Sequence, residues 1–226
     1  MVEYTLIFKN NSSNPGHGCV FQKDPDVNLP DVMSLAWFSK YTHPTTVQTF
    51  KWQINYDFVW AETGKLQAGV VFSTAQIWDA NLSTTNKVTL TNQGGAYTFK
   101  DQTQGSLQGN LYIWEDNTIP LKQASVGIGM SGAGVFAVQA QPNMNLVFRP
   151  HPKYWIAFGN YMPGEVLDIS MMTNDAVIEF PPNVYSMTAI LHKNNKFTVE
   201  PTSNVNEKFL KEMESGGADI EWGGDK

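Results

Sequence analysis

The sequence predicts an all-β protein, built as a single antiparallel, jelly-roll-like β-sandwich with a short C-terminal helix and an acidic tail. Large apolar side chains recur at every second position in many short runs, which is the period of a β-strand. Turn residues separate these runs at short intervals, and no helical stretch of 10–15 residues lies between them. We therefore assign residues 1–205 to the sandwich domain and residues 206–226 to the helix and tail.

The clearest strand pattern covers residues 50–60. Large side chains alternate there with mostly polar ones, and the large ones are Phe50, Trp52, Ile54, Tyr56, Phe58 and Trp60. Side chains at every second position share one face of a strand, so the pattern predicts one long strand that covers a core. The chain opens in the same way, with Tyr4, Leu6 and Phe8 alternating with polar residues.

Shorter runs continue the β pattern to the end of the body. They lie at residues 70–72, 87–91, 96–100, 107–114, 135–141, 144–149, 154–158, 166–170, 176–180, 187–192 and 196–200. Glycine, proline and asparagine clusters punctuate them, as at residues 92–95, 141–143, 162–164, 181–183 and 194–195. Short strands at this spacing are typical of a sandwich.

A short amphipathic helix is expected near the C-terminus. Asn206 is a suitable N-cap, while Phe209, Leu210 and Met213 share one helical face. The glycine pair at residues 216–217 ends the pattern.

The segment after this helix is predicted to be an acidic tail. Trp222 is its only large apolar anchor. Residues 207–226 carry six acidic and three basic side chains, so they supply half of the net charge of −6. The β body is therefore even less charged than the overall figure of 16% indicates.

Composition excludes several classes of protein. Aromatic residues make up 12% and charged residues 16%, which argues against a disordered chain. A net charge of −6 and a pI near 5.1 argue against binding to nucleic acid through its phosphates. No apolar run approaches the roughly 18 residues of a membrane span, and the N-terminus lacks a signal-peptide pattern. We expect a cytoplasmic protein. Export by a route that needs no cleaved signal stays open as an alternative.

The segment 127–132 matches the G-x-G-x-x-G pattern of dinucleotide-binding loops. That fingerprint needs a strand before it and a helix after it. Residues 133–138 read instead as a strand. The motif therefore predicts a glycine-rich strand or bend where another backbone packs closely.

No motif for catalysis or metal binding stands out, so we expect no enzyme activity, catalytic residue, cofactor or metal. His17 and Cys19 lack the second ligand pair of a closed metal site, and a buried inert thiol is the expected state of the single cysteine. A chemical role for this pair stays open. Glu115 and Asp116 are expected in a solvated turn after a strand. A hydrolase with two cleft carboxylates remains an alternative, because sequence does not show their separation.

Seven tryptophans raise the alternative of a carbohydrate-binding protein, since indole rings stack on sugar faces. Trp52 and Trp60 lie on the packed face of the best strand and are expected in the core. Trp37, Trp78 and Trp114 are less constrained and are the candidates for ligand binding.

Arg149 is the only arginine in the chain, and prolines at positions 150 and 152 follow it. Its planar guanidinium can pair with a carboxylate, within the chain or across a subunit interface. The alternative is a solvent-facing side chain at a strand end. Together with Phe209 and Trp222, Arg149 is a candidate assembly residue.

Three segments resemble the RhiA family, the rhizosphere-induced proteins of root-associated bacteria. They are YTLIFKNNS at residues 4–12, MSLAWFSK at 33–40 and FKWQINYDFVW at 50–60. The resemblance covers roughly the first 80 residues. It implies a bacterial protein that is abundant under cell-density control and linked to life near a host, and it carries over no enzyme activity or catalytic residue.

The sequence thus favours a non-enzymatic binding or assembly protein that associates with itself. Weakly charged strand faces rich in Thr, Asn and Gln offer little repulsion between copies. A lectin-like sandwich that binds a glycan is the first alternative, and the hydrolase is the second.

Overall fold

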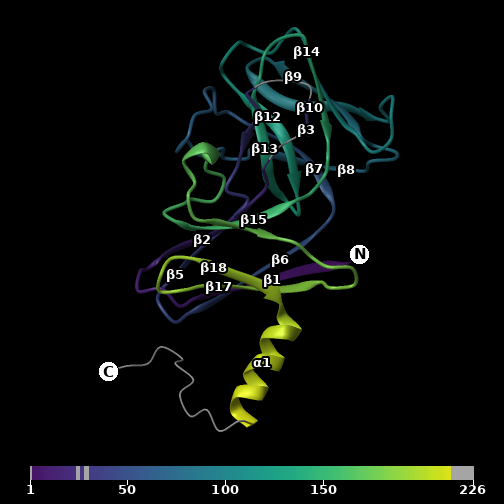
Figure 1. The fold of residues 1–226 in the computed structure, drawn as a ribbon. Helices are drawn as coiled ribbons and strands as arrows, with labels where there is room; N and C mark the ends of the chain where they lie inside the picture. Colours follow the sequence, from purple (N-terminus) through teal and green to yellow (C-terminus); the bar gives the residue numbers. More distant parts are fainter. Residues whose placement is uncertain (1, 24–25, 28–30, 215–226) are drawn as a thin grey trace.

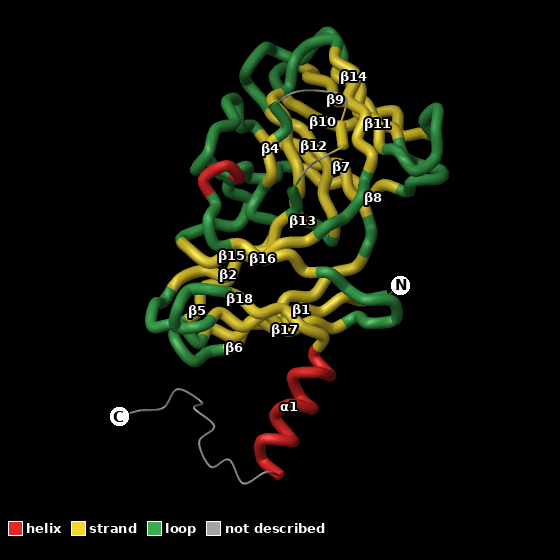
Figure 2. Tube along the Cα trace, in the orientation of Figure 1, coloured by secondary structure: helices red, strands yellow, loops and turns green. Residues whose placement is uncertain are grey.

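The computed structural model describes residues 2–23, 26–27 and 31–214 and shows an all-β body with one C-terminal α-helix (Figures 1 and 2). The predicted fold class is confirmed. The strands of these residues form four sheets, which lie as two facing pairs (Figure 2).

Sheets A and B make the lower pair in Figure 1, with Phe8 and Phe158 packed between them at a ring separation of 6.1 Å. Sheet A has the order β18 (Phe197–Pro201), β17 (Ser186–Leu191), β1 (Glu3–Asn10) and β6 (Val47–Gln53). Sheet B has the order β16 (Asp175–Ile178), β15 (Tyr154–Gly159), β2 (Gly16–Phe21) and β5 (Phe38–Thr42).

Sheets C and D make the upper pair, with Phe99 and Phe58 packed between them at 6.2 Å. Sheet C has the order β10 (Ala96–Thr103), β9 (Lys87–Gln93), β11 (Leu111–Glu115), β14 (Met144–Arg149) and β3 (Asp26–Val27). Sheet D has the order β4 (Met33–Ser34), β13 (Ala133–Gln139), β12 (Ser125–Met130), β7 (Tyr56–Ala61) and β8 (Gln76–Ala80). A short 3-10 turn, η1, covers Ile169–Met171.

The sequence predicted a purely antiparallel sandwich, but two of the strand pairs are parallel. β1 pairs with β17 in parallel, and β11 pairs with β9 in parallel. Both pairs join strands that are not neighbours along the chain, so the local turn signals do not reveal them.

The two sheet pairs share one continuous core. Met130 of β12 lies at their junction, where its carbonyl accepts a hydrogen bond from the Trp37 indole at 2.8 Å. Its sulfur is 3.9 Å from the hydroxyl of Tyr154 in β15. The chain also crosses between the two sheet pairs four times. Strands β1, β2, β5, β6 and β15 to β18 belong to the lower pair, and strands β3, β4 and β7 to β14 belong to the upper pair.

The predicted strand 50–60 is two strands. β6 ends at Gln53 and β7 begins at Tyr56, and the two belong to different sheets. Ile54, at the break, is 40% exposed although it shares the apolar alternation. The alternation therefore marks the buried faces correctly but does not show where the chain moves from one sheet pair to the other.

The glycine segment 127–132 forms the end of β12 and the turn after it, as predicted. A Cβ atom on Gly127 would lie only 1.9 Å from the carbonyl oxygen of Phe136, so glycine allows the close approach of β13. Gly132 has a φ of +75°, which glycine adopts without strain.

Helix α1 covers Thr202–Glu214. It begins four residues before the predicted N-cap, so Asn206 lies inside the helix. The start follows directly from β18, which ends at Pro201. The predicted acidic tail and Trp222 lie outside the described residues.

Candidate functional site

Helix α1 projects from sheet A instead of lying along it (Figures 1 and 2). Its start is held by the Thr202 hydroxyl, which is 2.8 Å from the Ser186 hydroxyl and 3.1 Å from that of Thr188. Six residues further along α1, Lys208 forms an ion pair with Glu200 of β18 at 2.6 Å. The contacts that position α1 are therefore concentrated near its N-terminal half.

A groove of about 580 Å³ lies between α1 and the outer face of sheet A. Thr188 and Ile190 of β17 form part of its floor, and Val205 and Phe209 of α1 form part of its wall. Phe209, a predicted assembly residue, is thus half-buried in this groove.

The apolar face of α1 is wider than its contact with the sheet. Val205, Phe209 and Met213 follow one another at four-residue spacing, and Leu210 extends the same face. Leu210 is 55% and Met213 56% exposed. We call Val205, Phe209, Leu210 and Met213 together the helix surface.

Two of the three tryptophan candidates pack into the body. Trp37 is 2% exposed and contributes to the core, so the prediction that it binds a ligand is wrong. Trp78 is half-buried and packs against Phe99 with ring centroids 5.8 Å apart. Trp37 therefore presents no open face to a sugar.

Trp114 is 36% exposed on the outer face of sheet C. Its cross-strand neighbours are Thr89 of β9 and Asn145 of β14, which supply a hydroxyl and an amide beside the indole. Arg149 is exposed on the same face, two alternations further along β14. Strand pairing thus brings a ligand-binding candidate and an assembly candidate onto one surface.

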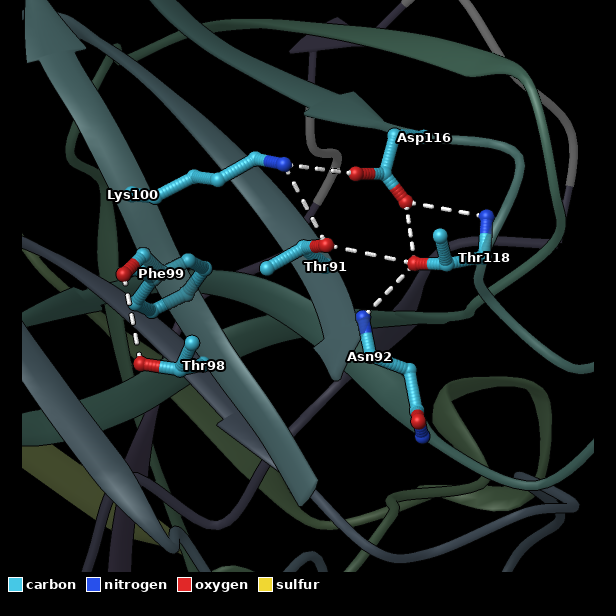
Figure 3. Close-up of polar contacts among 7 residues, drawn as sticks. All are labelled: Thr91, Asn92, Thr98, Phe99, Lys100, Asp116 and Thr118. Carbon is cyan, nitrogen blue, oxygen red and sulfur yellow. Dashed lines mark hydrogen bonds and ion pairs between the residues drawn. The ribbon is translucent and has the colours of Figure 1, made fainter. Parts of the chain in front are cut away.

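A polar network occupies the β9–β10 side of this face (Figure 3). Lys100 forms an ion pair with Asp116 at 3.0 Å and reaches the Thr91 hydroxyl at 3.3 Å. The other Asp116 oxygen accepts hydrogen bonds from the Thr118 hydroxyl and backbone amide. Burial alone would raise the pKa of Asp116, but the hydrogen bonds from Thr118 and Lys100 outweigh it and lower the pKa to about 2. The network fixes the loop after β11 with ionised partners.

The assembly candidates do not form one site. Arg149 belongs to β14 in the upper sheet pair, whereas Phe209 belongs to α1, which projects from the lower pair (Figure 1). Trp222 lies outside the described residues.

His17 and Cys19 lie on β2, on the face turned away from sheet A. Cys19 is fully buried, and burial raises the pKa of its thiol. The prediction of a buried thiol is confirmed. Within the described part of the chain, no three His, Cys, Asp or Glu side chains gather as metal ligands do.

Glu115 is the residue that the sequence placed wrongly. It is the last residue of β11, is 1% exposed and points between sheets C and D instead of into a solvated turn. The signal was present in the alternation, because Glu115 follows Leu111 and Ile113 on the same buried face.

The fold is that of a β-rich protein with two stacked sheet pairs and a projecting C-terminal helix. The model of the RhiA family matches residues 2–202. Protein RhiA of Rhizobium leguminosarum bv. viciae is 36% identical over 202 residues, which cover 88% of this chain and 87% of that protein. The chain therefore belongs to the RhiA family, and the similarity extends well beyond the first 80 residues.

No solved structure matches this fold significantly. Among the described residues, no helix has the length and apolar character needed to cross a membrane.

Proposed function

We propose that this RhiA-family protein is a non-enzymatic binding protein that associates with a second copy of itself through the helix surface. The observation that carries the proposal is the exposure of Leu210 and Met213 on a helix that projects from the body.

The stability of α1 supports this proposal. A helix of 13 residues is marginal in water unless an apolar face packs against something. Sheet A covers the side that carries Val205 and Phe209, and Leu210 and Met213 stay exposed. The same surface of a second copy, related by a twofold axis, would bury these side chains on both molecules at once.

The charge of the body supports the same conclusion. Only 16% of the residues are charged, so two copies repel one another weakly. A second copy is therefore the simplest partner with a matching apolar surface.

Light scattering coupled to size exclusion, over a range of protein concentrations, tests the proposal. The wild-type chain should shift from monomer to dimer as concentration rises. Leu210→Glu combined with Met213→Glu should abolish the shift, because a carboxylate buried at the contact is strongly unfavourable. Asn204→Glu adds the same kind of charge on the polar side of α1 and is the matched control.

A wild-type protein that stays monomeric at every concentration would overturn the proposal. So would a double variant that dimerises as well as the Asn204→Glu control.

The exposed indole of Trp114 favours a second candidate function, the binding of a glycan on the outer face of sheet C. Thr89 and Asn145 flank the indole, as polar side chains flank a stacked sugar. Binding on a glycan array that is lost on Trp114→Ala, while Trp78→Ala retains it, would support this candidate. A silent array would eliminate it.

A further inference from the structure

A cavity of about 210 Å³ opens between sheets C and D, at the end where β11 and β13 finish. Glu115 and Gln139 bring polar groups to it, and Val138, Met144 and Leu146 give it apolar walls. Asp31, which is exposed, also contributes to its lining.

Two buried polar atoms on residues that line this cavity have no hydrogen-bond partner. Oε2 of Glu115 accepts a hydrogen bond from the backbone amide of Gln141 at 3.3 Å, but Oε1 is buried without a hydrogen bond. Nε2 of Gln139 is likewise buried without one. Buried polar groups are nearly always hydrogen-bonded, and leaving one unsatisfied costs roughly 1–3 kcal/mol.

We propose that this cavity is a binding site for a small uncharged molecule, of which one hydroxyl group bridges Glu115 and Gln139. The site is separate from the helix surface and from Trp114, which lies on the opposite face of β11. The inference therefore goes beyond both functions proposed above.

The hydroxyl group follows from the chemistry of the two partners. An ionised carboxyl group only accepts hydrogen bonds, whereas a protonated one also donates. A side-chain amide exchanges the positions of its donor and acceptor when it flips by 180°. A hydroxyl both donates and accepts, so it satisfies Glu115 and Gln139 in each of these states. An ammonium group only donates, so it cannot accept from Nε2 of Gln139, the atom that lacks a partner.

The charge and size of the ligand follow from the rest of the lining. A carboxylate or phosphate would meet the acidic side chain of Asp31, and among the described residues that line the cavity no lysine or arginine would balance its charge. The volume is below the roughly 300–1,000 Å³ of pockets for drug-sized ligands, so it takes a single molecule of about monosaccharide size. The apolar walls suit the C–H faces of a sugar or cyclic polyol.

This geometry favours binding over hydrolysis. A glycosidase must hold the rings on both sides of the scissile bond between its carboxyl groups. The cavity has room for one ring, so the hydrolase alternative gains no support from the presence of Glu115 and Asp31 together.

Titration of the full-length protein with glycerol, xylitol, glucose and myo-inositol, followed by amide NMR, tests the proposal. At least one probe should change the NMR chemical shift of the Gln141 backbone amide, which donates a hydrogen bond to Glu115. Glucuronate should not, because its carboxylate is excluded.

Two substitutions connect the signal to the cavity. Gln139→Met removes the amide and keeps the length of the side chain, and we expect affinity to fall by about tenfold. Glu115→Met removes the other partner of the hydroxyl group, so we expect affinity to fall by a similar factor. Gln93→Met makes the same replacement at an exposed glutamine of β9. It is the matched control and should bind the probe with wild-type affinity.

The proposal is overturned if no probe shifts Gln141, or if Gln139→Met binds as tightly as Gln93→Met. A crystal structure of the wild-type protein soaked in the best probe gives a check that does not depend on variants. Density for the probe hydroxyl between Glu115 and Gln139 would support the site, and ordered water alone would refute it.

Discussion

Glu115 shows how strand geometry places a carboxyl group in the interior. It follows Leu111 and Ile113 on the inward face of β11, so alternation carries it between the sheets. Burial disfavours the charged form and raises the pKa of Glu115 from its usual 4.5 to about 8, although the hydrogen bond from the Gln141 amide opposes the shift. The side chain is therefore a neutral acid below about pH 8.

This shift makes the stability of the protein depend on pH. The folded protein holds a proton that the unfolded chain releases above its pKa of 4.5, so the free energy of unfolding falls as pH rises from about 4.5 to about 8. At about 1.4 kcal/mol per pKa unit, the loss is on the order of 5 kcal/mol.

Glu115→Gln should remove this slope and make the variant more stable than wild type at pH 9. Urea unfolding at several pH values measures both effects. Asp116 provides a useful contrast, because its pKa of about 2 places its titration below this window. A variant with the same slope as wild type would contradict the assignment of the raised pKa to Glu115.

At the scale of one element, β2 depends on a glycine. A Cβ atom on Gly18 would lie 2.5 Å from Cδ1 of Phe8, on the facing strand β1. Phe8 is fully buried and has Phe158 and Phe197 as ring neighbours at about 6 Å, so it has little room to move. The glycine therefore sets the spacing between sheets A and B.

Gly18→Ala should lower the free energy of unfolding by about 1–3 kcal/mol, the usual cost of overpacking a core. Phe8→Leu removes part of the obstructing ring, so the double variant should lose less stability than the two single losses added together. Denaturant unfolding of the four proteins in this cycle is the measurement. Additive losses would show that Gly18 and Phe8 are not coupled.

At the scale of the whole molecule, neither sheet pair is a continuous stretch of chain. The lower pair contains both the first and the last strands, and the core continues through Met130. We expect the two sheet pairs to unfold together. Hydrogen exchange in increasing denaturant should give peptides from β1 and β12 the same midpoint, whereas two separate midpoints would show two independent units.

The sequence predicts local features of this fold better than its long-range connections. Alternation identified buried faces such as that of Phe58, and the glycines at 127 and 129 indicated a close strand contact. The break at Ile54 and the parallel pairing of β1 with β17 depend on contacts between distant segments, so no local pattern reveals them. The same limit affected the site: composition suggested exposed tryptophans, but only the packing shows that Trp37 is core.

In the proposed dimer, α1 pairs with α1 of a second copy. The chain is well suited to a crosslinking test, because its single cysteine, Cys19, is buried and its thiol has a raised pKa. Leu210→Cys introduces a reactive thiol at the exposed edge of the helix surface, and Asn204→Cys introduces one on the polar side of α1. Cys19 then serves as an internal background in both variants.

The measurement is the rate of disulfide-linked dimer formation under mild oxidation, at equal concentrations of the two variants. If helix surfaces meet across a twofold axis, Leu210→Cys should crosslink rapidly and Asn204→Cys only slowly. Equal rates, or the absence of a crosslinked dimer for Leu210→Cys, would contradict the proposed assembly.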